Sequence, residues 1–314
     1  MLTTNAPQTF TALAALHNMS DPAVWRNMNQ AELDAAYDQA KYAPNQSQIL
    51  KRFTSNSEAC RERLGVPQRM AYGNAPVESL DIYTSRTVPP TGAPINVFIH
   101  GGAWRSGVAR DYGFLAETFV HAGAHFVVPD FDSVTDTDGS LQPVAAQVRR
   151  ALAWVVSHAK ELGGDPERIY ISGHSSGGHL AAVLLTTDWK ADFGLPADVI
   201  RGALCCSGIY ELMPVALSSR SSYLKITTDD KQALSPYRNL AQVRAPLLLA
   251  YGSLETPEFQ RQAVDFFAAL QDAHKPSQLL LAEGYNHFEI LETMASPYGL
   301  LGRAVLAQME LGNN

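Results

Sequence analysis

Residues 169–180 read Ile-Tyr-Ile-Ser-Gly-His-Ser-Ser-Gly-Gly-His-Leu. Their β-branched start predicts a strand and their end a helix, so Gly-x-Ser-x-Gly, centred on Ser175, falls on the turn between them. A serine that projects its hydroxyl from such a turn needs a strained backbone, and Gly173 and Gly177 lie where a Cβ would collide with the neighbouring elements. We therefore predict that Ser175 is a nucleophile. A chance glycine-rich turn is the alternative.

Strands and helices alternate on both sides of this stretch. We predict strands at residues 79–85, 95–99, 125–131, 168–172, 199–206, 246–251 and 278–281. Helices are predicted at residues 111–122, 143–162, 177–187, 258–273 and 300–311. This alternation predicts an α/β domain over residues 71–314, with a mostly parallel sheet covered by helices on both faces. The last helix could serve a dimer interface as readily as the core.

Residues 1–70 are expected to form an N-terminal helical cap segment. Asp21-Pro22 and Asn29 are plausible helix starts, and residues 46–64 form a second helix that ends at Gly65. The segment precedes the first convincing strand, so it is expected to pack on the main domain rather than extend its sheet. Its aromatic residues are pocket candidates, although aromatics on helices are commonly core: Phe10, Trp25, Tyr37 and Tyr42.

The loop after the predicted strand 95–99 reads His-Gly-Gly-Ala-Trp, residues 100–104. An oxyanion needs closely approaching backbone N–H groups, which small residues permit. We predict an oxyanion hole from Gly101, Gly102, Ala103 and the N–H of Ser176. In it Gly102 and Ala103 donate, while Gly101 lets the loop turn. His100 is expected to organise the loop, and the Trp at 104 either walls the acyl pocket or packs the loop.

Two histidines lie well downstream of Ser175, and hydrolases with this turn place the base last, after the acid. His274 ends an amphipathic helix, where a cation complements the helix dipole. His287 lies in a loop after the strand 278–281, so we predict it as the general base. His174 and His179 are expected to pack or hydrogen-bond around the turn.

The acid is expected in residues 252–259, after the strand 246–251. Thr256 resembles an N-cap and Pro257 a first helical residue. Glu258 then lies in the first helical turn, where the helix dipole alone explains a carboxylate. Glu255 precedes the cap and has no such explanation. We predict Glu255 as the acid that orients the histidine, with Glu258 as the main alternative.

The composition excludes some classes of protein. The formal net charge of −7 and the absence of a Lys/Arg run argue against a nucleic-acid partner. The three cysteines, Cys60, Cys205 and Cys206, are expected to be structural reduced thiols. The N-terminus lacks a basic start and no apolar stretch is long enough to span a bilayer, so we expect a cytoplasmic protein. No metal- or dinucleotide-binding motif is present, so no cofactor is expected.

With these residues identified, the chain resembles the arylformamidase (kynurenine formamidase) branch of α/β-hydrolases, close to the hormone-sensitive-lipase-like esterases. The resemblance covers most of the chain and rests on residues 100–104, 173–180 and 207–212. The run 255–259 is similar to an acid-Ser-Pro-Glu-Phe pattern whose first carboxylate is the triad acid, which supports Glu255. Family members often carry Asp there, and a bulky aromatic at the position of Ala103.

Together these observations predict an α/β-hydrolase that cleaves a small carboxylic ester or amide through an acyl-enzyme. The alternative is an arylformamidase that hydrolyses N-formylkynurenine or a related aryl amide. A non-catalytic binding protein would not need to keep nucleophile, base, acid and oxyanion loop together. A partly aromatic pocket is expected for a small-molecule substrate, from five side chains: Tyr37, Trp104, His174, Tyr210 and Phe288.

Overall fold

The computed structural model describes residues 22–87 and 92–311. Eight strands form one sheet in the order β1-β2-β4-β3-β5-β6-β7-β8. The strands are β1 Gln68–Ala71, β2 Ser79–Tyr83, β3 Ala93–Ile99, β4 His125–Pro129, β5 Gly164–His174, β6 Ile200–Cys206, β7 Leu247–Gly252 and β8 Ser277–Ala282. β2 pairs antiparallel with β1 and β4, and the other pairs are parallel. The predicted α/β fold with a mostly parallel sheet is confirmed.

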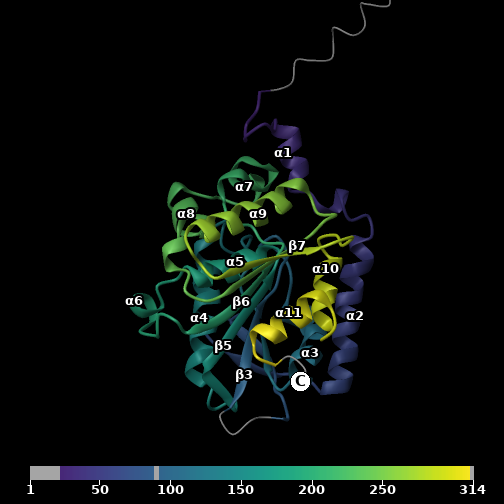
Figure 1. The fold of residues 1–314 in the computed structure, drawn as a ribbon, viewed down its shortest axis with the longest axis vertical. Coiled ribbons are helices and arrows are strands. Elements are labelled where there is room, and N and C mark those ends of the chain that lie inside the picture. The colour runs from purple at the N-terminus through teal and green to yellow at the C-terminus, as the bar shows by residue number, and fades with distance from the viewer. Residues whose placement is uncertain (1–21, 88–91, 312–314) are drawn as a thin grey trace, which may run out of the picture.

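Helices cover both faces of the sheet. The main ones are α2 Gln46–Leu64, α3 Ala116–His121, α4 Gln142–His158, α5 Ser176–Leu185, α9 Pro257–Asp272 and α11 Leu300–Gln308. One core cluster joins the sheet to α4, α5 and α9, and a second joins it to α2, α3 and α11. Figure 1 shows α2, α3 and α11 grouped on one side of the sheet. The shorter helices are α1 Gln30–Ala36, α6 Trp189–Phe193, α7 Met213–Leu217, α8 Thr228–Ala233 and α10 Glu289–Glu292.

The N-terminal segment is helical where the structure describes it. α1 begins with a capping box between Asn29 and Glu32, and α2 ends at Gly65 as expected. Phe53 of α2 stacks on Phe114 with the ring centroids 4.8 Å apart, which ties the helix to the domain. The expectation that the segment adds no strand was wrong, because residues 68–70 begin β1. This edge strand has only four residues and is mostly exposed, so it lacks the apolar alternation that marks a strand in sequence.

Two further helical predictions are resolved by the structure. Residues 111–122 do not form one α-helix, because a 3₁₀ helix, Ala109–Leu115, precedes α3. α11 buries Leu301, Val305 and Leu306 in the second core cluster, so the helix is part of the core.

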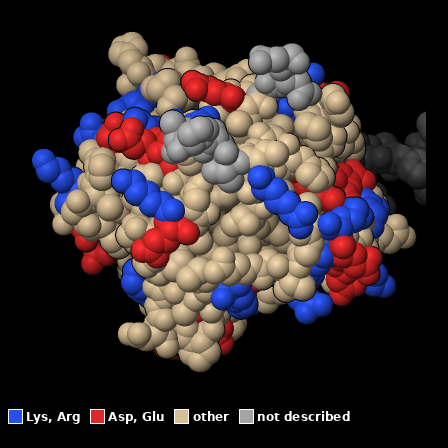
Figure 2. Space-filling view, turned by 90° about the horizontal axis from the view of Figure 1, so that it is seen from below, with Lys and Arg blue, Asp and Glu red and all other residues tan. Residues whose placement is uncertain are grey.

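The three cysteines are free and buried. Cys205 and Cys206 belong to different core clusters, as expected for neighbours on a strand that point to opposite faces. Burial raises the pKa of the Cys60 thiol to about 11, which keeps it protonated at neutral pH. Within the described part of the chain, no helix has both the length and the apolar composition to cross a membrane. On the face in Figure 2, basic and acidic side chains are interspersed.

Candidate active site

Ser175 lies on the turn between β5 and α5. Its backbone has φ +59° and ψ −124°, a conformation that is strained for a residue with a side chain. A Cβ added at Gly173 would collide with the backbone of Gly177, and one added at Gly177 would collide with the carbonyl of Ile99. The two glycines therefore allow β3, β5 and α5 to approach closely enough to form this turn.

Three of the predicted residues form one hydrogen-bonded chain. The Ser175 hydroxyl lies 2.9 Å from His287 Nε2, and His287 Nδ1 lies 2.8 Å from Glu255 Oε2. All three side chains are buried. With the Nδ1 proton donated to the carboxylate, Nε2 can accept the serine proton. His274 lies at the end of α9, where its N–H donates to the Gln271 carbonyl, and it is not part of this chain.

The second oxygen of Glu255 is also held. Oε1 accepts hydrogen bonds from Ser207 Oγ at 2.6 Å and from the Gly252 N–H at 2.7 Å. Ser207 follows β6 and has φ +53°. We made no prediction for this serine, although its position was a usable signal. It comes directly after the strand between β5 and β7, whose ends carry Ser175 and the Glu255 loop.

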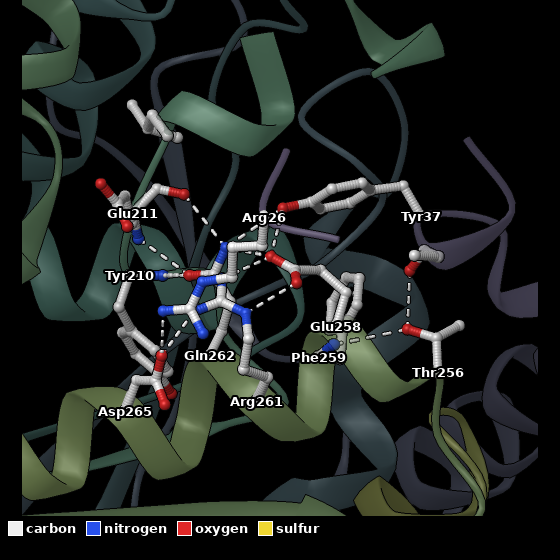
Figure 3. A network of polar contacts seen from close by, with 12 residues as sticks. Arg26, Tyr37, Tyr210, Glu211, Thr256, Glu258, Phe259, Arg261, Gln262 and Asp265 are labelled. Carbon is white, nitrogen blue, oxygen red and sulfur yellow. Dashed lines mark hydrogen bonds and ion pairs between the residues drawn. The ribbon is translucent and has the colours of Figure 1, made fainter. Parts of the chain in front are cut away.

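Glu258, the alternative acid, belongs to a different network (Figure 3). Its carboxylate accepts from the Arg261 guanidinium at 2.7 Å and 2.5 Å, and from the Tyr37 hydroxyl at 3.2 Å. Asp265 accepts from both Arg261 and Arg26. The network fastens α9 to the N-terminal segment. Thr256 caps α9 as predicted, with its hydroxyl 3.4 Å from the Phe259 N–H.

The loop after β3 has an unusual backbone. Gly102, Ala103 and Trp104 have φ values of +128°, +55° and +59°. A Cβ on Gly101 would lie 2.8 Å from the His174 carbonyl, so this residue allows the loop to approach the nucleophile turn. The N–H groups of Gly102 and Ala103 have no backbone acceptor within the described residues. Since Ser176 is the first residue of α5, its N–H has no partner inside the helix either.

The other histidines near the turn have structural partners. His174 Nε2 lies 2.7 Å from the backbone carbonyl of His287, to which it donates. His179 donates from Nε2 to the Leu234 carbonyl at 2.7 Å, and its Nδ1 accepts from Trp104 at 3.2 Å. His100 stacks on Phe131 with ring centroids 4.3 Å apart. Burial lowers the pKa of His174 to about 3 and that of His179 to about 4.

We expect these two histidines to make the fold sensitive to acid. In the unfolded chain both have a pKa near 6.5, so that chain binds their protons first as the pH falls. Stability is therefore full above about pH 7 and declines from about pH 6.5 toward pH 4, by about 1.4 kcal/mol per pH unit for each histidine. Denaturant titrations at pH 7.5 and 5.0 measure this slope. In the His179→Gln variant, unfolding should take up about one proton fewer, so the slope should be smaller. An unchanged slope would contradict the lowered pKa of His179.

A cavity of about 490 Å³ opens at Ser175, a size suited to a small organic molecule. Its walls include the predicted Tyr37, His174 and Phe288, together with Gly102, Ala103 and His287. Residues for which we made no prediction complete it: Asp38, Gln39, Ala40, Gln46, Leu50, Phe53, Thr54, Arg105, Ser106, Gly107, Asp111, Tyr112 and Arg220.

Two predicted pocket residues do not line this cavity. Trp104 is only 2% exposed and packs behind the loop, where its indole N–H binds His179. Tyr210 is fully buried, stacks on Phe266 at 4.4 Å and donates to the Cys205 carbonyl. The pocket prediction for Tyr210 was wrong, because its ring is held by packing inside the protein. Of the two roles predicted for Trp104, the structure shows packing of the loop. Of the other aromatic candidates, Trp25 packs against the first core cluster and Tyr42 is exposed, while Phe10 lies outside the described residues.

The N-terminal segment also reaches the loop that carries the histidine. Asn45 donates to Glu289 at 2.6 Å and accepts from Asn286 at 3.0 Å, next to His287.

Within residues 22–87 and 92–311, no three His, Cys, Asp or Glu side chains gather as they would around a metal ion.

The fold and the Ser175 turn define the protein as an α/β-hydrolase, and comparisons agree. Residues 145–298 match the prolyl oligopeptidase family and residues 80–198 match the BD-FAE family. The structure is similar to a putative thioesterase from Silicibacter sp. TM1040, with TM-score 0.75 and 25% identity, covering 86% of this chain and 97% of that one. An esterase from Thermogutta terrifontis with bound propionate has TM-score 0.66 and 22% identity, covering 80% and 97%.

Relatives that are similar in sequence indicate the family within the α/β-hydrolases. The chain is 30% identical to a kynurenine formamidase from Danio rerio over 299 residues, which covers 92% of this chain and 98% of the relative. It is 28% identical to a kynurenine formamidase from Salmo salar, covering 86% and 93%. The chain belongs to the kynurenine formamidase family, and it is a serine hydrolase of the esterase or arylformamidase type.

Proposed function

We propose that the protein hydrolyses aryl formamides such as N-formylkynurenine, and that short aryl esters react by the same route. The observation that carries the proposal is the hydrogen-bonded chain from Ser175 through His287 to Glu255 at the wall of the cavity. The kinship with two kynurenine formamidases supports the formamide as substrate. The rings of Phe53, Tyr112 and Phe288 supply aromatic surface for an aryl group.

The geometry supports acyl transfer in two steps. His287 Nε2 takes the Ser175 proton while Oγ attacks the carbonyl carbon, and the N–H groups of Gly102, Ala103 and Ser176 receive the oxyanion. His287 then protonates the leaving nitrogen or oxygen, its bond to the carbonyl carbon breaks, and the acyl group remains on Ser175. Water, deprotonated by His287, then attacks the acyl carbonyl. The bond from that carbon to Ser175 Oγ breaks, His287 returns the proton to Oγ, and the acid is released.

A paired kinetic measurement tests the substrate. We expect kcat/KM on N-formyl-L-kynurenine of about 10⁴ M⁻¹s⁻¹ or more, in the usual enzyme range. Phenyl acetate measured beside it reports the generic esterase activity of the same site. Rapid ester turnover with negligible formamide cleavage would contradict the formamidase proposal and leave a carboxylesterase.

The remaining organisational predictions stay proposals. We propose that residues 1–70 act as a cap over the catalytic domain, supported by Tyr37 in the cavity wall and by the Asn45 contacts beside His287. The Asn45→Ala variant removes these contacts, and its KM tests the proposed cap.

A cytoplasmic location is supported by three free thiols. A homodimer stays a prediction that sedimentation of the purified protein tests.

A further inference from the structure

Arg220 places a positive charge in the wall of the catalytic cavity. It follows α7 in a 3₁₀ turn, Ser219–Ser222, whose start is held by a hydrogen bond from the Ser219 N–H to Asp34 Oδ1 at 2.6 Å. The side chain lines the same cavity as Ser175 and His287. A guanidinium stays protonated at any pH at which a protein is folded, so its charge is permanent.

The guanidinium is surrounded by aromatic rings rather than by a carboxylate. Its carbon lies 5.3 Å from the ring centroid of Tyr37, 5.7 Å from that of Trp104 and 5.8 Å from that of Phe259. Phe259 in turn meets His287 edge-on at 5.0 Å. The charge is therefore separated from the catalytic imidazole by one ring.

The hydrogen-bonding capacity of Arg220 is largely unused. Nη2 donates to the Tyr37 carbonyl at 3.1 Å. Nη1 is buried and has no hydrogen-bond partner among the described residues. No carboxylate of the described residues lies within ion-pair distance of it, while most other arginines of the structure have one. An unpaired buried donor costs free energy. Because the Arg220 side chain is partly exposed and lines the cavity, its guanidinium keeps hydrogen-bonding capacity for an acceptor on a bound molecule.

The surroundings restrict the charge of that acceptor. Asp38 and Asp111 line the same cavity and would repel a dianion such as a phosphate monoester. Asp38 is near enough to favour the charged guanidinium, whose pKa burial lowers. A single negative charge on a planar group matches one guanidinium edge, and a carboxylate has that charge and shape.

We propose that Arg220 selects substrates that carry a carboxylate away from the carbonyl under attack. The inference deepens the proposed hydrolase function, because it assigns the substrate class of the same cavity. The aromatic rings around the guanidinium exclude water, which strengthens the pairing. In this arrangement Arg220 acts on binding and orientation, and the proton transfers remain with His287.

The test uses inhibitors, so that it does not require the formamide to be the substrate. Phenyl acetate hydrolysis by the full-length protein reports competition by 4-phenylbutyrate and by the neutral 4-phenylbutyramide. We expect the wild-type protein to bind the carboxylate at least about 10-fold more tightly than the amide, since hydrogen bonds to charged groups are the stronger ones. Arg220→Gln should abolish this ratio and Arg220→Lys should retain part of it.

A second cavity arginine gives a matched control. Arg105 is exposed and lies over the Tyr223 ring at 4.6 Å, so Arg105→Gln should keep the preference for the carboxylate. Each ratio is measured within one variant, so differences in turnover cancel, and measurable turnover shows that the variant has folded. Equal inhibition of the wild type by acid and amide, or a preference that survives Arg220→Gln, would overturn the proposal. A retained preference without formamide cleavage would contradict only the formamidase proposal.

Discussion

Ser175→Ala is expected to lower kcat/KM on any ester or formamide substrate by about 10³- to 10⁶-fold. The Oγ atom lies 2.9 Å from His287 Nε2 and is the only part of the side chain that the substitution removes. Because the backbone N–H groups of the oxyanion loop remain, residual activity above the uncatalysed rate is expected. Stopped assays with high enzyme concentration measure the loss.

The fold of this variant should be unaffected, since alanine keeps the Cβ of the strained turn. We expect the Tm of this variant to lie within about 2 °C of the wild-type Tm, which corresponds to a small change in the free energy of unfolding. Ser157→Ala, at the exposed end of α4, provides a serine control with normal turnover. Activity of Ser175→Ala within about 10-fold of the wild type would show that another group is the nucleophile.

Glu255→Gln is expected to have the second largest effect, a loss in kcat of about 10²- to 10⁴-fold. An amide in this place cannot stabilise the imidazolium, and its NH₂ group would favour the wrong tautomer of His287. Both carboxylate oxygens are engaged, by His287 on one side and by Ser207 and Gly252 on the other. Steady-state kinetics over pH 6–9 measure the loss.

Glu258→Gln is the matched control for this substitution. It removes one negative charge three residues away, from a carboxylate bound to Arg261 and Tyr37. We expect it to lower thermal stability, because it leaves the arginine with a weaker partner, and to reduce kcat by less than about 10-fold. The opposite ranking, with Glu258→Gln nearly inactive and Glu255→Gln active, would contradict the assignment of the acid.

The sequence was most informative where a local rule has one structural solution. Gly-x-Ser-x-Gly between a strand and a helix permits few backbones, so the position of Ser175 followed from spacing alone. Glu255 was distinguished from Glu258 by the cap at Thr256, and the structure places Glu255 beside His287. In both cases residues close together in sequence carry the whole argument.

The cavity depends on contacts between distant segments, so the sequence predicted only part of its wall, including Tyr37, His174 and Phe288. Tyr210 and Trp104 are aromatic and close in sequence to the site, yet both rings point into packed regions. Arg220 and Tyr112 line the cavity from two short 3₁₀ helices, which the apolar pattern of the sequence does not mark. Nothing local distinguishes an arginine that faces a cavity from one that faces solvent.

The most direct test of the central claim is to trap the acyl-enzyme position with a fluorophosphonate and to locate the adduct by peptide mass spectrometry. We expect one phosphonyl group per chain, carried by Ser175, absent from Ser175→Ala and formed much more slowly in His287→Ala. Stoichiometric labelling of a different residue, or an adduct that persists in Ser175→Ala, would contradict the assignment of Ser175 as the nucleophile.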